Sequence, residues 1–310
     1  MASKSTPESV FDHVILLIPY SQLSSPPKWL SDAFTILDGG LHEGGMTENK
    51  LVIFQDGVYL ELIAFVDGLS PQHRAMHPWG KQPDGHIIHW AHTILSREEE
   101  EGSNTSEERF RAVQSRIQDS QVGIRYLDPD PGFRTMADGS KRIWANAIPN
   151  FDNHKGPIYV NQQPFWTFDR TPRPLRAPVT PENTSHPSGV VGVAGISLFI
   201  KDKQALDNMV PFYNAIFNKP AIKESPSDSV TRYKWEAASP SHEEFGKRHF
   251  FLYHGVNDAF TEEEMAEANG AVPEIFIKLS LYTKGKAGSV KGMLVEGTLI
   301  TFELIPTISS

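Results

Sequence analysis

Two ionisable side chains lie within apolar, strand-like segments near the N-terminus. His13 occurs in the segment FDHVILLIP at 11–19, and Glu61 occurs in VYLELIAF at 58–65. Burying either group unpaired is costly, so each must face an opening or find a partner. If the two strands share a sheet and the groups point to the same face, they form half of a divalent-metal site. The alternative is a histidine and a glutamate that only satisfy hydrogen bonds at a sheet edge.

A glycine-rich segment, GGLHEGGMTEN at 39–49, contains a second group of candidate residues. Its glycines permit positive φ and close backbone approach, so His42, Thr47 and Asn49 can line a cleft beside a ligand. His42 can then act as a general acid or base, because the pKa of an unperturbed imidazole lies near neutrality. The alternative is a connection whose histidine and asparagine only satisfy backbone groups.

Histidines and aromatic residues supply the remaining candidates. His89 and His92 are three residues apart, so in a strand they point to opposite faces and at most one can join a site. Trp90, Phe165 and Trp166 are of a type that packs in cores, but in a cleft they would form an apolar wall suited to a hydrophobic or aromatic substrate.

Composition restricts the class of protein. The chain has 310 residues, 39% of them apolar, and a net charge of −9, which leaves no basic surplus for nucleic acid or an anionic membrane. It has no cysteine, which excludes disulfides, thiolate metal sites and a cysteine nucleophile. The first ten residues lack the apolar core of a signal peptide, and no apolar stretch reaches the length of a membrane span. We therefore expect a soluble, cytoplasmic protein.

The same order of strand, helix and strands is predicted three times along the chain, and such repetition indicates a modular fold. In the first copy, strand 11–19 precedes a helix over 29–37 that ends at 38–40. Strands 51–55 and 58–65 follow, and Asp56-Gly57 between them predicts a tight hairpin. The second copy has predicted strands at 87–95, 132–135, 141–147 and 157–168. The third has predicted strands at 191–200, 230–236, 248–253, 274–282 and 294–304, with a helix that Asp202 caps.

These copies define the expected domains. Residues 11–170 are predicted to form a pair of modules, and 190–310 a third module. Between them, 171–189 is rich in proline and is expected to be an extended, stiff linker.

The copies resemble the βαβββ modules of the vicinal oxygen chelate superfamily, and among its branches the chain resembles the glyoxalase-like domain family. The match is carried by FDHVI at 11–15, GGLHEGGMTEN at 39–49 and FQDGVYLELI at 54–63. Weaker matches are HWA at 89–91, Arg176-x-Pro178 and His186-Pro187-x-Gly189. The resemblance implies an α+β fold in which repeated βαβββ modules form curved mixed sheets around a cleft.

The resemblance also implies where a metal would bind. In the superfamily the ligands come from the first and last strands of each module, positions that His13 and Glu61 occupy in the first module. The second module has Trp90 where a ligand histidine would align, and its last strand has no aligned carboxylate. Because a catalytic metal usually has about three protein ligands, a site for Zn, Fe, Mn or Ni is incomplete unless His89 or His92 adds to it.

The function that the resemblance implies is an enzyme of lyase or isomerase type. Its substrate would be a small, rather apolar molecule with a carbonyl or hydroxyl group, in secondary metabolism or detoxification. Glu61 would be the base or a ligand, His13 a ligand or the acid, and His42 and Asn49 would orient the substrate oxygen. A bound metal would polarise that oxygen. Without one, Glu61 in an apolar pocket is expected to have a raised pKa and to work as a lone base.

Two other hypotheses remain open. A non-catalytic protein of the bleomycin-resistance type would bind and sequester a small toxic compound, and it would need only the aromatic wall. A scaffold would use its odd module to pair with another chain, because the unpaired sheet edge could be covered in a symmetric homodimer.

Overall fold

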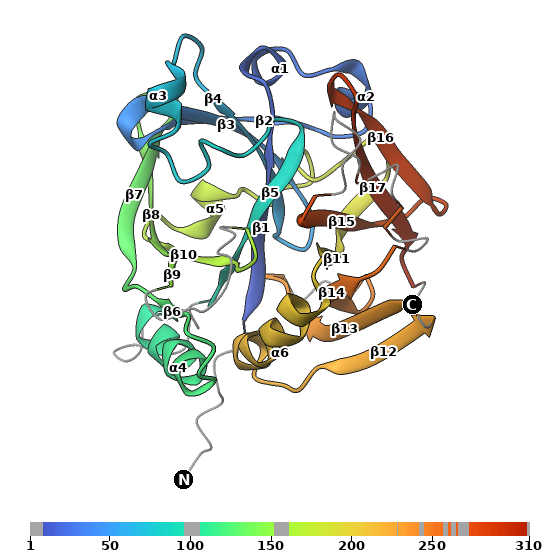
Figure 1. Ribbon diagram of the computed structural model, residues 1–310. Coiled ribbons are helices and arrows are strands. Elements are labelled where there is room, and N and C mark those ends of the chain that lie inside the picture. Colours follow the sequence, from blue (N-terminus) through green and yellow to red (C-terminus); the bar gives the residue numbers. More distant parts are fainter. Residues whose placement is uncertain are drawn as a thin grey trace.

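The chain folds into a closed barrel and an open sheet that lie side by side (Figure 1). The computed structural model describes residues 9–95, 106–151, 161–227, 229–241, 245–256, 260–261, 265 and 273–308. The strand order in the barrel is β1-β4-β3-β2-β7-β8-β10-β5, and the open sheet has the order β12-β13-β14-β11-β15-β17-β16. These mixed sheets and few helices confirm the expected α+β class.

The barrel consists of two sets of four strands, which correspond to the two expected modules. The first set is β1 (Val10–Leu17), β2 (Leu37–His42), β3 (Thr47–Ile53) and β4 (Tyr59–Phe65). The second set is β5 (His86–Thr93), β7 (Asp130–Thr135), β8 (Lys141–Ala147) and β10 (Phe165–Asp169). In each set the first strand is parallel to the last, and β1/β5 and β2/β7 join the sets. The first part of the strand expected at 157–168 lies outside the described residues.

Short helices and one longer helix connect these strands. They are α1 (Tyr20–Ser24), α2 (Lys28–Ser31), the 3-10 turn η1 (Glu43–Gly45), α3 (Pro71–Arg74) and α4 (Ser106–Asp119). A small ribbon pairs β6 (Arg125–Tyr126) with β9 (Pro149–Asn150).

The open sheet contains a third set of strands and then three more. The third set is β11 (Val190–Ile200), α6 (Lys203–Phe217), β12 (Ile222–Ser227), β13 (Val230–Ala237) and β14 (Arg248–His254). It is followed by β15 (Ile275–Thr283), β16 (Gly288–Val295) and β17 (Thr298–Pro306). The prediction of a single strand over 294–304 is wrong, because β16 ends at Val295 and β17 begins at Thr298. These two strands form a hairpin that turns at Gly297, whose φ of 79° suits glycine.

The helix expected over 29–37 is also wrong. Only α2 is helical there, and Leu37–His42 forms strand β2. Gly39 is not a helix stop: a Cβ at this position would lie 1.9 Å from Asn49 Oδ1, so glycine permits β2 to approach β3. By contrast, the tight turn expected at Asp56-Gly57 is confirmed, with Gly57 at a φ of 80° and its N–H donating to Phe54 O at 3.0 Å.

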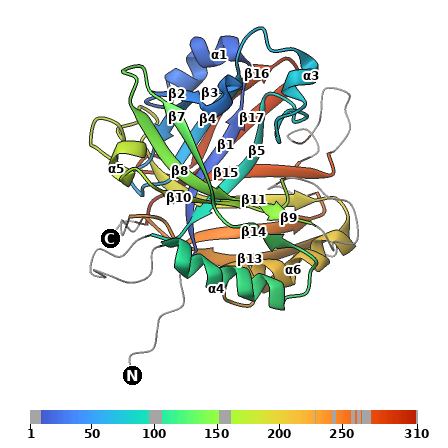
Figure 2. The ribbon, with the colours of Figure 1, turned by 90° about the vertical axis from the view of Figure 1, so that its left-hand side faces the viewer.

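The main hydrophobic core lies between the barrel and the open sheet. Trp90 of β5 stacks on Phe250 of β14, with ring centroids 5.5 Å apart. Helices α4 and α6 lie side by side at one end of this core (Figure 2), where Arg116 Nε donates to Ala215 O at 3.0 Å. A separate apolar cluster fills part of the barrel interior.

The proline-rich segment 171–189 packs against the barrel and includes α5 (Arg173–Arg176). Arg173 Nη2 donates to Gly57 O at 2.9 Å, and His186 Nε2 lies 3.0 Å from Ile53 O. The segment expected to be a stiff linker is therefore held against the barrel by these contacts.

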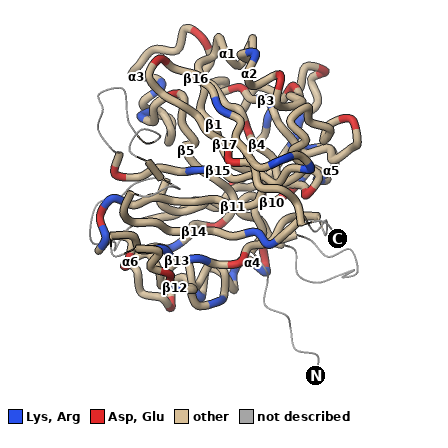
Figure 3. Tube along the Cα trace, turned by 90° about the vertical axis from the view of Figure 1, so that its right-hand side faces the viewer, with Lys and Arg blue, Asp and Glu red and all other residues tan. Residues whose placement is uncertain are grey.

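Charged residues of both signs are interspersed along the chain, as Figure 3 shows for the side that it presents. None of the helices in the described ranges has the length and apolar character that crossing a membrane requires.

Candidate active site

His13 and Glu61 lie on neighbouring strands and face the interior of the barrel. β1 and β4 are parallel, with His13 beside Tyr59 and Ile15 beside Glu61. Because side chains alternate along a strand, His13 and Glu61 point to the same face. His13 Nε2 lies 3.5 Å from Glu61 Oε2. The structure thus brings these two predicted residues together.

A hydrogen-bond network holds the Glu61 carboxylate in place. Asn49 Nδ2 donates to Glu61 Oε1 at 2.6 Å, while Asn49 Oδ1 accepts the N–H of Gly40 at 3.0 Å. The Gly40 bond fixes which end of the amide is the oxygen. The same Nδ2 lies 3.2 Å from His42 Nε2, which must therefore accept, and His42 Nδ1 lies 2.9 Å from Thr47 Oγ1. Asn49 and Thr47 both line the barrel cavity, as the sequence analysis expected, and their hydrogen bonds also position Glu61 and His42.

Charge also holds Glu61 ionised. Burial alone would raise the pKa of Glu61, but the neighbouring His13 and His42 and the Asn49 hydrogen bond outweigh burial and lower it. The raised pKa expected from the apolar sequence context is therefore wrong. Burial lowers the pKa of His42 by more than the attraction of the Glu61 carboxylate raises it.

Behind His13, an ion-pair cluster contains a residue that the sequence reasoning missed. The register of β1 against β5 shifts between Phe11 and His13, which makes Asp12 the extra residue of a β-bulge. Bulges re-aim side chains beside functional sites. Asp12 is fully buried, and its Oδ1 lies 2.6 Å from His13 Nδ1.

Two arginines of α5 neutralise Asp12. Arg176 donates to both carboxylate oxygens, at 2.8 and 3.1 Å, and Arg173 forms a second ion pair with Oδ2. Burial would raise the pKa of Asp12, but Arg173 and Arg176 together with His13 lower it well below its usual value. An ionised Asp12 accepts a hydrogen bond from Nδ1–H of His13, so Nε2 is the atom that faces Glu61.

The interior of the barrel opens as a cavity of about 210 Å³. Aromatic side chains form much of its wall, and His13 stacks on Tyr59 with centroids 4.7 Å apart. β7 and β8 contribute polar side chains, Arg134 and Asn146, as well as aromatic ones. Beyond Tyr59, Arg176 and the residues of the hydrogen-bond network, the cavity is lined by Glu43, His77, Trp79, Gly132, Phe133, Arg134, Trp144, Asn146, Phe165 and Thr167.

Phe165 lines this cavity, but the two tryptophans expected to share its wall do not. Trp90 and Trp166 are fully buried outside the barrel, in the core against the open sheet. For Trp166 the reason is its position next to Phe165, since adjacent residues of a strand face opposite ways. The predicted role of Trp90 and Trp166 in substrate binding is corrected accordingly.

The histidines of β5 do not extend the site. His89 accepts from Trp79 Nε1 at 3.1 Å and its Nε2 lies 2.8 Å from Gln163 O, so both ring nitrogens are occupied. His92 lies outside the barrel, with its ring 5.5 Å from that of Trp166. Burial lowers the pKa of His89 to about 4 and that of His92 to about 3.

The residues present do not fit a resident metal. Within the described ranges, no group of three histidine, aspartate or glutamate side chains is placed to hold an ion. The Glu61 oxygen on the side of His42 already accepts the Asn49 amide. Among the residues that the structure describes, His13 and Glu61 are thus two metal donors without a third.

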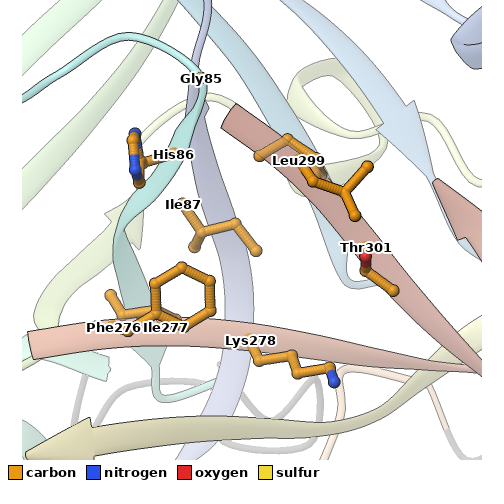
Figure 4. A pocket seen from close by; sticks show the side chains of 9 residues that line it. Gly85, His86, Ile87, Phe276, Ile277, Lys278, Leu299 and Thr301 are labelled. Carbon is orange, nitrogen blue, oxygen red and sulfur yellow. The ribbon is translucent and has the colours of Figure 1, made fainter. Parts of the chain in front are cut away.

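A second cavity, of about 20 Å³, lies between β5, β15 and β17 and is shown in Figure 4. Ile87, Phe276 and Leu299 are among its lining side chains, and none of the candidate site residues borders it. Its volume suits about one water molecule, so the barrel cavity is the better candidate site.

Sequence reasoning missed Asp12, Tyr59, Arg134 and Arg176. Asp12 could have been noticed as the only acidic residue of an apolar strand. Arg176 was noticed only as part of a motif match, and Arg134 carries no local signal.

Comparisons with known proteins agree with this architecture. The model of the glyoxalase-like domain matches residues 11–211, and no curated protein matches the sequence. A crystal structure of a hypothetical protein from Staphylococcus aureus is similar with a TM-score of 0.62 and 15% identity, covering 96% of this chain and all of that one.

Two further solved structures are less similar. A mutant of 4-hydroxymandelate synthase from Streptomyces coelicolor has a TM-score of 0.48 and 12% identity, over 89% of this chain and 71% of that one. BphC, a halotolerant catechol dioxygenase, has a TM-score of 0.47 and 8% identity, over 99% and 90%. Because the domain model matches well over half of the sequence, from β1 into α6, the chain belongs to the glyoxalase-like domain family.

Proposed function

We propose that this protein is an enzyme of lyase or isomerase type that moves a proton on a small carbonyl compound, with Glu61 as the base. One observation carries the proposal: an ionised, buried carboxylate is fixed by Asn49 and faces a cavity opposite a second proton carrier, His13. A general base must be ionised and within hydrogen-bond reach of the proton that it removes.

The chemistry uses the two facing groups in turn. Glu61 takes a proton from the carbon next to the carbonyl group, and the electron pair of that C–H bond moves to the carbonyl oxygen to give an enolate. His13 exchanges a proton at Nε2, while Asp12 holds Nδ1–H and thereby fixes the ring orientation. In a hydroxyketone, Nε2 of His13 takes the hydroxyl proton and passes it to the former carbonyl oxygen, and the proton held by Glu61 returns to the former carbonyl carbon, which gives isomerisation. Where the next carbon bears a leaving group, the electron pair of the enolate expels it, which gives elimination.

The cavity favours a small and partly apolar substrate. Its volume of about 210 Å³ is below the ~300–1,000 Å³ of pockets for drug-sized ligands. The aromatic wall formed by Trp79, Trp144 and Phe165 favours a hydrophobic body. The same wall would also serve a protein that only sequesters its ligand, which is the second candidate function.

Deuterium exchange separates the two functions without knowledge of the substrate. Small ketones, hydroxyketones and 2-oxo acids are incubated with the protein in D₂O, and exchange next to the carbonyl is followed by ¹H NMR. We expect exchange with at least one compound, and we expect its loss in Glu61→Gln. Glu303→Gln is the matched control, because Glu303 is an exposed, hydrogen-bonded glutamate on β17, outside the cavity.

Exchange in Glu61→Gln at the wild-type rate would refute the role of Glu61. If a compound binds equally to wild type and Glu61→Gln and neither protein exchanges any compound, sequestration is the better account.

A further inference from the structure

Arg134 is a buried cation in the wall of the cavity. It lies on β7 directly opposite His42 on β2, and it is only 3% exposed. Both residues line the cavity. Arginine stays charged in proteins, so a full positive charge is present beside the proposed base.

The guanidinium of Arg134 is incompletely paired. Nη2 donates to Arg176 O at 2.8 Å, while the buried Nε has no hydrogen-bond partner in the described part of the chain. A buried charge without a counter-ion is costly. Burial lowers the pKa of Arg134, which is the expected sign of that cost.

Within the ranges that the structure describes, the other two buried arginines each form an ion pair, which Arg134 does not. Arg176 contacts Asp12 at 2.8 Å, and Arg248 contacts Asp56 at 3.3 Å. No ion pair among the described residues includes Arg134. Glu61 attracts Arg134 without forming an ion pair with it, and the Glu61 carboxylate is already held by Asn49 and the two histidines.

We propose that Arg134 binds a carboxylate group of the substrate, so that the ligand of this cavity is a small carboxylic acid with an apolar body. The inference rests on the proposed function, because it concerns the same cavity and places the reacting carbon of the acid near Glu61. A planar guanidinium matches a carboxylate with two parallel hydrogen bonds. A monoanion balances the charge of Arg134, whereas a phosphate dianion would add a second negative charge near Glu61.

Pairs of an acid and its neutral amide test the inference by calorimetry at pH 7. Suitable probes are propionate with propionamide and phenylacetate with phenylacetamide. For at least one pair we expect the acid to bind the wild type about tenfold more tightly or better, as hydrogen bonds to charged groups imply. Arg134→Gln should bring the acid down to the affinity of the amide.

Arg142→Gln is the matched control. Arg142 on β8 pairs with Arg134 on β7 in the strand register. Like Arg134, it donates to a backbone carbonyl of α5, Leu175 O at 2.9 Å, but it does not line the cavity. This variant should keep the acid preference. Should Arg134→Gln fail to fold, Arg134→Lys keeps the charge and loses the planar fork, and it should weaken acid binding about threefold or more. Unchanged acid affinity in Arg134→Lys overturns the inference.

The remaining outcomes separate this inference from the proposed function. Equal affinity for acid and amide in every pair, or no measurable binding of any acid, overturns it. So does an acid preference that survives in Arg134→Gln. An acid preference that depends on Arg134 supports the inference even if the wild type exchanges no deuterium, in which case only the proton transfer by Glu61 fails.

Discussion

Replacing Asp12 with asparagine tests whether the ion-pair cluster behind His13 stabilises the fold. Asp12 is fully buried and accepts hydrogen bonds from Arg173, Arg176 and His13. Asparagine has nearly the same shape but no charge, and its amide N–H₂ group would face arginine donors. Breaking a buried ion pair by removing one partner costs about 3–5 kcal/mol, so we expect Asp12→Asn to lower the free energy of unfolding by about that amount at pH 7.

The effect should depend on pH in a defined direction. The pKa of Asp12 is lowered in the folded protein, so its stabilisation is fully present above the unfolded-state pKa of about 3.9 and is lost as the pH falls through the lower folded value. The gap between wild type and Asp12→Asn should therefore be complete at pH 7 and shrink below about pH 4.

Urea denaturation followed by tryptophan fluorescence and circular dichroism measures this gap at both pH values. Asp32→Asn is the control, because the Lys28–Asp32 pair is exposed and should contribute about 0–0.5 kcal/mol. A loss below about 1 kcal/mol for Asp12→Asn at pH 7, or a gap that stays the same at pH 3, would refute the reasoning.

Four further changes probe the site and its supports. Asn49→Ala removes a hydrogen bond that lowers the pKa of Glu61, so the acid limb of deuterium exchange should move to higher pH, and an unmoved limb contradicts the network. Gly39→Ala should cost about 1–3 kcal/mol in urea denaturation and slow exchange, whereas Gly288→Ala, which meets open space, should do neither. Trp166→Phe should lower the free energy of unfolding by about 1–3 kcal/mol yet leave the acid-to-amide affinity ratio unchanged. Chelation with EDTA should leave both the Tm and the exchange rate unchanged, because the described residues provide no third ligand.

The convergence of His13 and Glu61 was predictable because it follows from local patterns. Both strands are apolar runs with one or two ionisable residues, and the Asp56-Gly57 turn sets the register of β4 against β3. The family resemblance then placed His13 and Glu61 on the first and last strands of one module, and the structure shows that these two strands pair in parallel. Because side chains alternate along a strand, the pairing of β1 with β4 then puts His13 and Glu61 on the same face.

Features that depend on contacts distant in sequence were not predictable in the same way. The bulge at Asp12 is visible only in the pairing of β1 with β5. The direction of the Glu61 pKa shift was wrong because its sequence neighbours are apolar, while its neighbours in space are His13, His42 and Asn49. Similarly, both Phe165 and Trp166 were expected in the cleft wall, although adjacent residues of β10 face opposite ways and only Phe165 lines the cavity.

The segment after the last barrel strand completes the site, although its sequence indicates a linker. Arg173 and Arg176 lie beyond β10, so a barrel that ended at Asp169 would keep every barrel strand and lose the partners of Asp12. Asp12 would then be a buried carboxylate with His13 as its remaining cationic partner, and its pKa would rise. A protonated Asp12 no longer acts as a pure acceptor for Nδ1–H of His13, so the orientation of that ring would be released. The geometry of the candidate site therefore depends on α5 as well as on the paired modules, which agrees with a family match that continues past the barrel to residue 211.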